Sequence, residues 1–199
     1  MILAHDLGTT GDKATLVRAD GSLAGSVTAA YPVDLDPNGK AEQNPSDWWD
    51  AVCTSTRELL AKTGTSAADV DVVSFSGQMM GAVFVDTENA PLRPAIIWAD
   101  TRSSEQSGRI LARVGMERGY QITGHRINPT YSLSKIAWLR DHEPEVFDRT
   151  DAVLLPKDYL VARLTGVRAT DPSDASGTNA YDQGARAWSD EMLDAAGIQ

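Results

Sequence analysis

The segment Asp6-Leu7-Gly8-Thr9-Thr10-Gly11 combines a carboxylate with a turn of small polar residues near the start of the chain. A carboxylate at a strand end can hold Mg²⁺ through water, and successive backbone N–H groups in a Gly/Thr turn form a concavity that suits phosphate oxygens. Lys13 lies close enough in sequence to add a positive charge. The residues alone leave two interpretations open: a phosphate-binding turn, and a polar hairpin turn whose glycines adopt positive φ.

The same turn is compatible with a different enzyme class. Aspartic peptidases place a catalytic carboxylate in an Asp-x-Gly-Thr turn and pair it with a second, equivalent carboxylate. That class expects Ser or Thr where this chain has Leu7, and no second Asp-x-Gly-Ser/Thr segment occurs. A peptidase half-site therefore stays as an alternative that would require a homodimer.

The loop Ser76-Gly77-Gln78-Met79-Met80-Gly81 follows an expected buried strand over residues 70–75. Binding sites built on a sheet usually lie where strands end, and glycines at a loop permit close approach of a ligand. Gln78 offers both a donor and an acceptor to a polyol. The alternative is a loop that carries two core methionines.

The segment Trp98-Ala99-Asp100-Thr101-Arg102 also ends an expected strand. A sugar site commonly combines an aromatic face with a carboxylate and a guanidinium that hold hydroxyls or each other. The alternative is structural, with Asp100 capping the following helix and Arg102 paired to it.

Other reactive side chains are weaker candidates. Asp174 lies in a run of small polar residues over 170–178, for which we expect an architectural role, as a loop held against the first strands by Ser, Thr and Asp hydrogen bonds. The histidines have no metal-ligand spacing, and Cys53 falls inside an expected helix as a small core residue.

The elements that must position these residues begin with three strands joined by tight turns, an antiparallel opening unlike that of a dinucleotide-binding unit. The pattern then predicts alternating helix and strand, which indicates an α/β fold with a mixed sheet and flanking helices, of the ribonuclease-H-like kind found in actin and hexokinase. The expected strands cover 2–6, 13–17, 23–30, 70–75 and 94–98, and the expected helices 44–63, 102–114, 134–141, 157–164 and 191–196.

Composition excludes several classes of partner. The chain has 199 residues, 42% of them hydrophobic, and a formal net charge of -10. Nucleic acids and anionic membranes bind clustered Lys and Arg, and no such cluster occurs, so we expect neither partner. No apolar run approaches membrane-spanning length, and a single cysteine fits a reducing compartment, which favours the cytoplasm.

Taken in order, these segments resemble the FGGY carbohydrate kinase family, and within it most closely the xylulokinases. The resemblance covers the whole chain, and the order and spacing of its pieces carry it. The pieces are 6–11 with Lys13, Glu42-Gln43-Asn44-Pro45 with Trp48 and Trp49, 76–81, 98–102, Asn128-Pro129 with Ser132, 135–139, Glu143-Pro144, 155–160, 164–166 and 171–178.

The resemblance implies an ATP-dependent sugar kinase with Mg²⁺, acting on a small-molecule sugar, most closely D-xylulose. It implies that Asp6 handles the Mg²⁺ and the transferring phosphate, and that Gly8, Thr9, Thr10 and Lys13 form the first phosphate loop. It assigns Met79, Met80 and Trp98 to the sugar pocket, supported by the polar side chains Gln78, Asp100 and Arg102.

The resemblance also implies that residues 1–199 are an amino-terminal lobe, without the carboxy-terminal ATP-binding lobe and the proton-accepting Asp that family members carry further on. The 199-residue chain alone is then expected to be inactive, and a homodimer of the full-length protein is left open. Xylulokinases usually have His at the position of Met80. That departure keeps gluconate, ribulose and glycerol as alternative sugars, beside a non-enzymatic, actin-like sugar-binding lobe.

Overall fold

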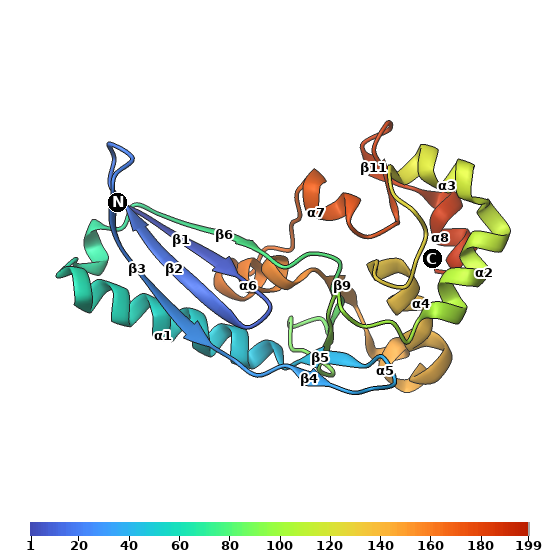
Figure 1. The fold of residues 1–199 in the computed structure, drawn as a ribbon, viewed down its shortest axis with the longest axis horizontal. Coiled ribbons are helices and arrows are strands. Elements are labelled where there is room, and N and C mark those ends of the chain that lie inside the picture. Colours follow the sequence, from blue (N-terminus) through green and yellow to red (C-terminus); the bar gives the residue numbers. More distant parts are fainter. Residues whose placement is uncertain (199) are drawn as a thin grey trace. The chain divides into compact units, whose positions relative to one another are not determined.

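The computed structural model describes residues 1–198 and divides them into two compact units (Figure 1). Unit 1 comprises Met1–Val33 and Asn44–Gln78, and unit 2 comprises Asp34–Gln43 and the chain from Met79 onward. The chain therefore passes from one unit to the other after Val33, after Gln43 and after Gln78.

Unit 1 is built on a four-stranded sheet in the order β3-β2-β1-β6. β1 pairs antiparallel with β2, and β2 with β3, so the predicted antiparallel opening is confirmed. β6 pairs parallel with β1, which makes the sheet mixed, as predicted. The strands are β1 (Ile2–Leu7), β2 (Gly11–Val17), β3 (Leu23–Ala30) and β6 (Val72–Gly77).

One long helix, α1 (Pro45–Thr63), packs against β2 and β3 of this sheet, and the short 3-10 helix η1 (Ala67–Asp69) follows it (Figure 1). Its start is encoded locally, because the Asn44 side chain accepts a hydrogen bond from the Ser46 N–H and Pro45 occupies the first turn. Gly64 ends the helix at φ 65°, where glycine carries no steric penalty. The predicted helix is confirmed. The core between helix and sheet includes Leu3, Ala14, Leu16 and Leu59.

The prediction that residues 70–75 form a buried strand is wrong about burial. β6 exists, but Val72 is 51% and Val73 42% exposed. The reason is its position, since β6 lies at an edge of the sheet order and has only β1 as a partner among the described strands. A β-branched run marks a strand but does not tell a central position from an edge.

Unit 2 contains only short strands. β4 (Asp34–Leu35), β5 (Ala41–Gln43) and β8 (Ala95–Ile96) form one antiparallel sheet. Two further antiparallel pairs are β7 (Val83–Val85) with β9 (Ala152–Leu154), and β10 (Tyr181–Asp182) with β11 (Ala187–Trp188). The predicted strand over 94–98 is therefore confirmed only in its middle.

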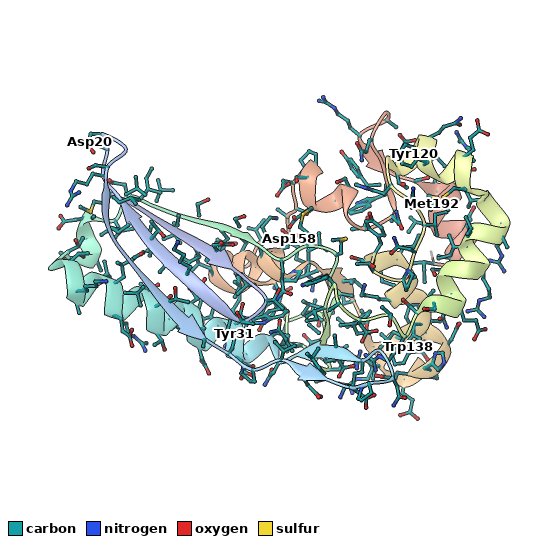
Figure 2. The ribbon with its side chains drawn as sticks, in the orientation of Figure 1. Asp20, Tyr31, Tyr120, Trp138, Asp158 and Met192 are labelled. Atoms are coloured by element: carbon teal, nitrogen blue, oxygen red, sulfur yellow. The ribbon has the colours of Figure 1, made fainter. Side chains whose placement is uncertain are left out.

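The helices of unit 2 surround a core that includes Ile110, Ile122, Leu133 and Met192, the last labelled in Figure 2. The predicted helix over 102–114 ends as expected, but Gly115 at φ 82° separates it from a second helix that sequence reasoning missed. The helices are α2 (Ser104–Val114), α3 (Met116–Thr123), α4 (Ser132–His142), α5 (Pro144–Arg149), α6 (Pro156–Thr165), α7 (Pro172–Ser176) and α8 (Asp190–Ala196). Within residues 1–198, none of the helices combines the length and apolar character needed to cross a membrane.

Candidate functional site

Asp6 and Lys13 lie directly opposite each other in the β1–β2 pair. Side chains on opposed positions of neighbouring strands share one face of the sheet. Both residues are exposed, whereas the alternating residues Leu3 and Ala14 are buried against α1. Neither the Asp6 carboxylate nor the Lys13 ammonium has a hydrogen bond or ion pair within residues 1–198. This face of unit 1 therefore presents a carboxylate and an ammonium that are both open to a ligand.

The turn between β1 and β2 is held by its own backbone. The Gly8 N–H lies 3.1 Å from the Asp6 carbonyl oxygen and 3.0 Å from the Gly11 carbonyl oxygen, and donates to both. Gly11 has to be glycine, because a Cβ there would lie 2.8 Å from the Ala29 carbonyl oxygen. Thr9 is half-buried and Thr10 is exposed, so the turn presents hydroxyl-bearing residues beside the Asp6–Lys13 pair.

Gln78 joins this group at the end of β6. Because β1 and β6 run parallel, both strands end at the same edge of the sheet. The Gln78 N–H donates to the Leu7 carbonyl oxygen over 2.8 Å, which ties the two strand ends together. The structure thus brings together the predicted residues of unit 1: Asp6, Gly8, Thr9, Thr10, Lys13 and Gln78.

A buried polar cluster beneath this turn was missed by sequence reasoning, which treated His5 as a weak candidate. His5 Nδ1 lies 2.9 Å from Asp12 Oδ2, and the Ser55 hydroxyl donates to the same oxygen over 2.6 Å. His5 and Asp12 are 2% and 0% exposed. Polar residues at alternating positions of two adjacent strands are the signal that would have found the pair, because such positions share a face.

In unit 2, Met80 has a strained backbone, with φ at 61°. Non-glycine residues in this region are uncommon and concentrate at functional sites. A Cβ added to Gly177 would lie 3.4 Å from both Met79 Cε and Met80 Cγ, so the two methionines lie against the segment that follows α7.

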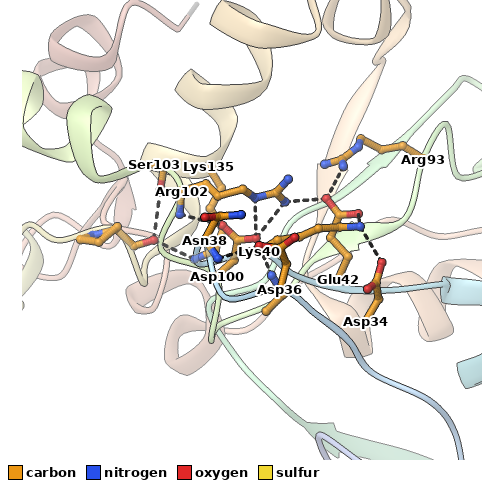
Figure 3. A network of polar contacts seen from close by, with 12 residues as sticks. Asp34, Asp36, Asn38, Lys40, Glu42, Arg93, Asp100, Arg102, Ser103 and Lys135 are labelled. Carbon is orange, nitrogen blue, oxygen red and sulfur yellow. Dashed lines mark hydrogen bonds and ion pairs between the residues drawn. The ribbon is translucent and has the colours of Figure 1, made fainter.

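Asp100 and Arg102 belong to a buried ionic network (Figure 3). Asp100 is 1% exposed and accepts from the Ala41 N–H over 2.8 Å and from Arg102 Nε over 2.9 Å. The Arg102 guanidinium also bonds Glu42 at 2.5 Å and lies 4.5 Å from the centre of the Trp138 ring. These contacts bind the loop after β8 to β5. Trp98 in the same segment is 40% exposed, in contrast to the buried Asp100.

Lys135 is a buried lysine at the edge of this network, also drawn in Figure 3. Its ammonium donates to the Pro129 and Thr130 carbonyl oxygens. Burial lowers the pKa of Lys135 to about 7, against the opposing effect of the Asp100 carboxylate. Lys135 therefore links the 128–131 segment to α4, because its ammonium donates hydrogen bonds to backbone carbonyl groups of that segment.

Asp174 is held by contacts within the fold, but its segment forms the short helix α7 and not the predicted loop. Lys157 Nζ lies 2.5 Å from Asp158, 2.9 Å from Asp171 and 3.0 Å from Asp174, the last without hydrogen-bond geometry. Burial raises the pKa of Asp174, and the Lys157 ammonium opposes that rise. Lys157 of α6 thus joins α7 through the carboxylates of Asp171 and Asp174.

A cavity of about 350 Å³ lies in unit 2 next to the Met80–Gly81 turn. Its lining is largely apolar and includes Gly81, Ser132, Thr178 and Trp188, but not Met79, Met80 or Trp98. None of the sequence-predicted site residues of unit 2 therefore lines this cavity. Within residues 1–198, no group of three or more His, Cys, Asp or Glu side chains is arranged to hold a metal ion.

The family model described as "FGGY family of carbohydrate kinases, N-terminal domain" matches residues 1–199. The chain belongs to this family. Xylulose kinase from Bacillus subtilis is 37% identical over 99% of this chain, which covers 39% of that protein. The solved structure of a xyloylose kinase from Brucella ovis matches with a TM-score of 0.92 and 37% identity, covering 98% of this chain and 41% of that one. Gluconate kinase from Lactobacillus acidophilus matches with a TM-score of 0.91 and 29% identity, covering all of this chain and 40% of that one.

These matches confirm the predicted fold class. As an FGGY kinase domain, the chain has the mixed α/β architecture of the actin and hexokinase type. The family also overturns the aspartic peptidase alternative for the Asp6 turn. The chain spans about two fifths of the length of the relatives it matches.

Proposed function

We propose that the natural protein carrying this chain transfers the γ-phosphoryl group of MgATP to a hydroxyl of D-xylulose. The observation that carries the proposal is the match of nearly the whole chain to relatives named xylulose kinase in several bacteria, at 37% identity in Bacillus subtilis and 39% in Escherichia coli. The open Asp6–Lys13 face of unit 1 supplies the groups that such a transfer needs on this chain.

The residues of unit 1 fit a Mg²⁺–nucleotide. Mg²⁺ is usually held by one or two carboxylates together with waters and substrate phosphates, so a single open carboxylate is sufficient. Asp6 would provide it, and the bound Mg²⁺ would neutralise charge that develops on the phosphate oxygens. Lys13, opposite Asp6 in the sheet, adds positive charge on the same face. The turn between β1 and β2 adds polar threonine and backbone groups beside this pair, and the Gly8 N–H keeps the turn in shape by donating to the Asp6 and Gly11 carbonyl oxygens.

In unit 2 we propose that Trp98, Met79 and Met80 contact the sugar. Trp98 offers an exposed aromatic face to apolar C–H surface, and the strained Met80 backbone fits a turn shaped for a ligand. Asp100 and Arg102 would not contact the sugar themselves but would hold the loop that carries Trp98. Their charged atoms are bonded to each other, to Ala41 and to Glu42. Gln78, at the end of β6 in unit 1, is kept as a proposed sugar-binding residue because its side chain offers both a donor and an acceptor to a hydroxyl.

A second candidate substrate is gluconate. The thioether of Met80 cannot exchange hydrogen bonds with a hydroxyl as an imidazole does, and a solved neighbour is named gluconate kinase. Ribulose and glycerol remain in the same group of alternatives. A lobe that binds sugar without catalysis is the alternative of another class.

The deciding experiment is sugar-dependent ADP release by the natural gene product, measured with MgATP and each of D-xylulose, gluconate, ribulose and glycerol. We expect D-xylulose to give the highest kcat/KM. A higher value with another sugar would move the substrate assignment, and no sugar-dependent release with any of them would reject the kinase proposal. The 199-residue chain, run alongside, is expected to be inactive.

A further inference from the structure

Tyr31 follows β3 directly and reaches the turn between β1 and β2; Figure 2 labels it where β3 ends. The residue is 7% exposed. Its hydroxyl donates to the Gly8 carbonyl oxygen, and its backbone N–H donates to the Thr10 carbonyl oxygen over 3.2 Å. One residue outside the turn therefore holds two of the carbonyl groups within it.

The first of these bonds has a directional consequence. The peptide group is planar and trans, so the Gly8 C=O and the Thr9 N–H lie in one plane and point in opposite directions. Fixing the Gly8 carbonyl toward Tyr31 therefore fixes the direction of the Thr9 N–H. An N–H group acts on an anionic oxygen only when it is aimed at that oxygen before the ligand arrives.

The surroundings of Tyr31 keep its hydroxyl a donor. Burial raises the pKa of Tyr31, and the nearby Asp12 and Asp6 carboxylates raise it further. The phenol therefore stays protonated across the neutral pH range. Because a carbonyl oxygen can only accept, the donor in this contact is the Tyr31 hydroxyl.

We propose that Tyr31 is a positioning residue of the phosphate loop: by holding the Gly8 and Thr10 carbonyl groups, it fixes the backbone of the turn against which the nucleotide phosphates bind. The inference rests on the proposed kinase function. Tyr31 was not among the residues singled out from the sequence, because an aromatic residue at the end of a strand is expected to be a core packing residue.

The test compares Tyr31→Phe with Tyr159→Phe in the natural gene product. Tyr159 is a matched control because it is buried in α6 of unit 2 and its hydroxyl accepts from Arg163 over 2.8 Å, so the same atom is removed elsewhere. Tyr31→Phe is expected to lower kcat about 10-fold to 100-fold, less than the full loss of a direct donor, and to change the KM for the sugar less than about twofold. Tyr159→Phe is expected to leave kcat within about twofold.

The second readout does not depend on turnover. Hydrogen exchange measured by mass spectrometry should be at least about tenfold faster in the peptide spanning Leu7–Gly11 of Tyr31→Phe, while peptides from α1 keep their protection and report an intact unit. Unchanged exchange in the turn would overturn the inference whatever the enzyme does. Faster exchange with an unchanged kcat would overturn it too, since the bond would then be only structural. If the wild type is active and Tyr31→Phe has the same kcat, only the positioning role of Tyr31 is rejected. If the wild type shows no sugar-dependent turnover, the kinase proposal is rejected and the positioning role with it.

Discussion

Asp6 in unit 1 and Asp100 in unit 2 are carboxylates of the same kind in opposite surroundings. Asp6 is exposed, faces Lys13 across the strand pair and has no bond to either oxygen within residues 1–198. Asp100 is 1% exposed and is bonded by a backbone N–H and by Arg102. The charge of Asp100 is compensated by hydrogen bonds within the fold, whereas the charge of Asp6 is left open to a ligand. Residue type alone could not separate these two uses, because both segments combine a carboxylate with a nearby cation.

The largest effect should come from Asp6. In the natural gene product, Asp6→Asn should lower sugar-dependent ADP release by at least about 10³-fold, because the Mg²⁺ and the phosphate lose a charged ligand. Its melting temperature should stay unchanged, since no bond of the fold is removed. Asp20→Asn, an exposed carboxylate in the β2–β3 turn of the same unit, is the control and should keep full activity. Equal activity in both variants would mean that the open carboxylate of Asp6 has no special role in catalysis.

Asp100 should show the reverse pattern. In the 199-residue chain, Asp100→Asn should lower the free energy of unfolding by about 2 to 3 kcal/mol, because Arg102 and the Ala41 N–H lose a charged acceptor in a buried place. Asp34→Asn, which removes an exposed partner of Lys40, should cost less than about 0.5 kcal/mol. Urea denaturation measures both. A loss at Asp100 no larger than at Asp34 would mean that the network in Figure 3 adds little stability.

A substitution at Met80 tests the sugar-binding residues proposed in unit 2. Met80→His should tighten D-xylulose binding by about 1 to 2 kcal/mol if the imidazole meets a buried hydroxyl. The backbone at φ 61° tolerates the change, because His is enriched among residues with positive φ. Titration calorimetry on the natural gene product measures it, with the exposed Met116→His as the control. Equal affinities, or tight binding of another sugar by the unmodified protein only, would mean that Met80 serves a different specificity.

The last prediction concerns the dependence of stability on pH through Lys135. With a folded pKa of about 7, against the ordinary value of 10.5, the unfolded chain binds the extra proton between these two pH values. Stability should therefore rise with pH across that window, by at most about 1.4 kcal/mol per pH unit. The difference between the native chain and Lys135→Met, measured by urea denaturation at several pH values, isolates this contribution. A difference that stays flat above pH 7 would place the ammonium in better-solvated surroundings.

The parts of the fold that the sequence predicted are those with local chemical signals. Asn44, Pro45 and Gly64 fix the two ends of α1 within a few residues of backbone, so that helix was found almost to the residue. The two-residue strands β4 and β8 have no room for a pattern and depend on pairing with β5. The exposure of Val72 depends on which strands neighbour β6, which no local pattern contains.

For the candidate site, the sequence located segments better than it assigned roles. It placed Asp6 and Gln78 on strand ends that the parallel pairing of β1 and β6 does bring together. It did not find the His5–Asp12 pair, because that contact depends on the strand register. It missed Tyr31 for a related reason, since a hydrogen bond to a carbonyl group 23 residues away cannot be predicted from the residues next to Tyr31 in sequence.

The way the chain divides between the two units has a consequence for its synthesis. Every strand of unit 1 and its helix α1 have been made once Gln78 has left the ribosome. Glu42, in contrast, belongs to unit 2 and finds its guanidinium partners in Arg93 and Arg102, 51 and 60 residues later in sequence. At roughly 5 to 20 residues per second, that delay lasts about 3 to 12 seconds. Within the nascent chain, a segment whose arginine partners are not yet made thus lies between two pieces of unit 1, so unit 1 has to tolerate an unfinished insertion while it forms.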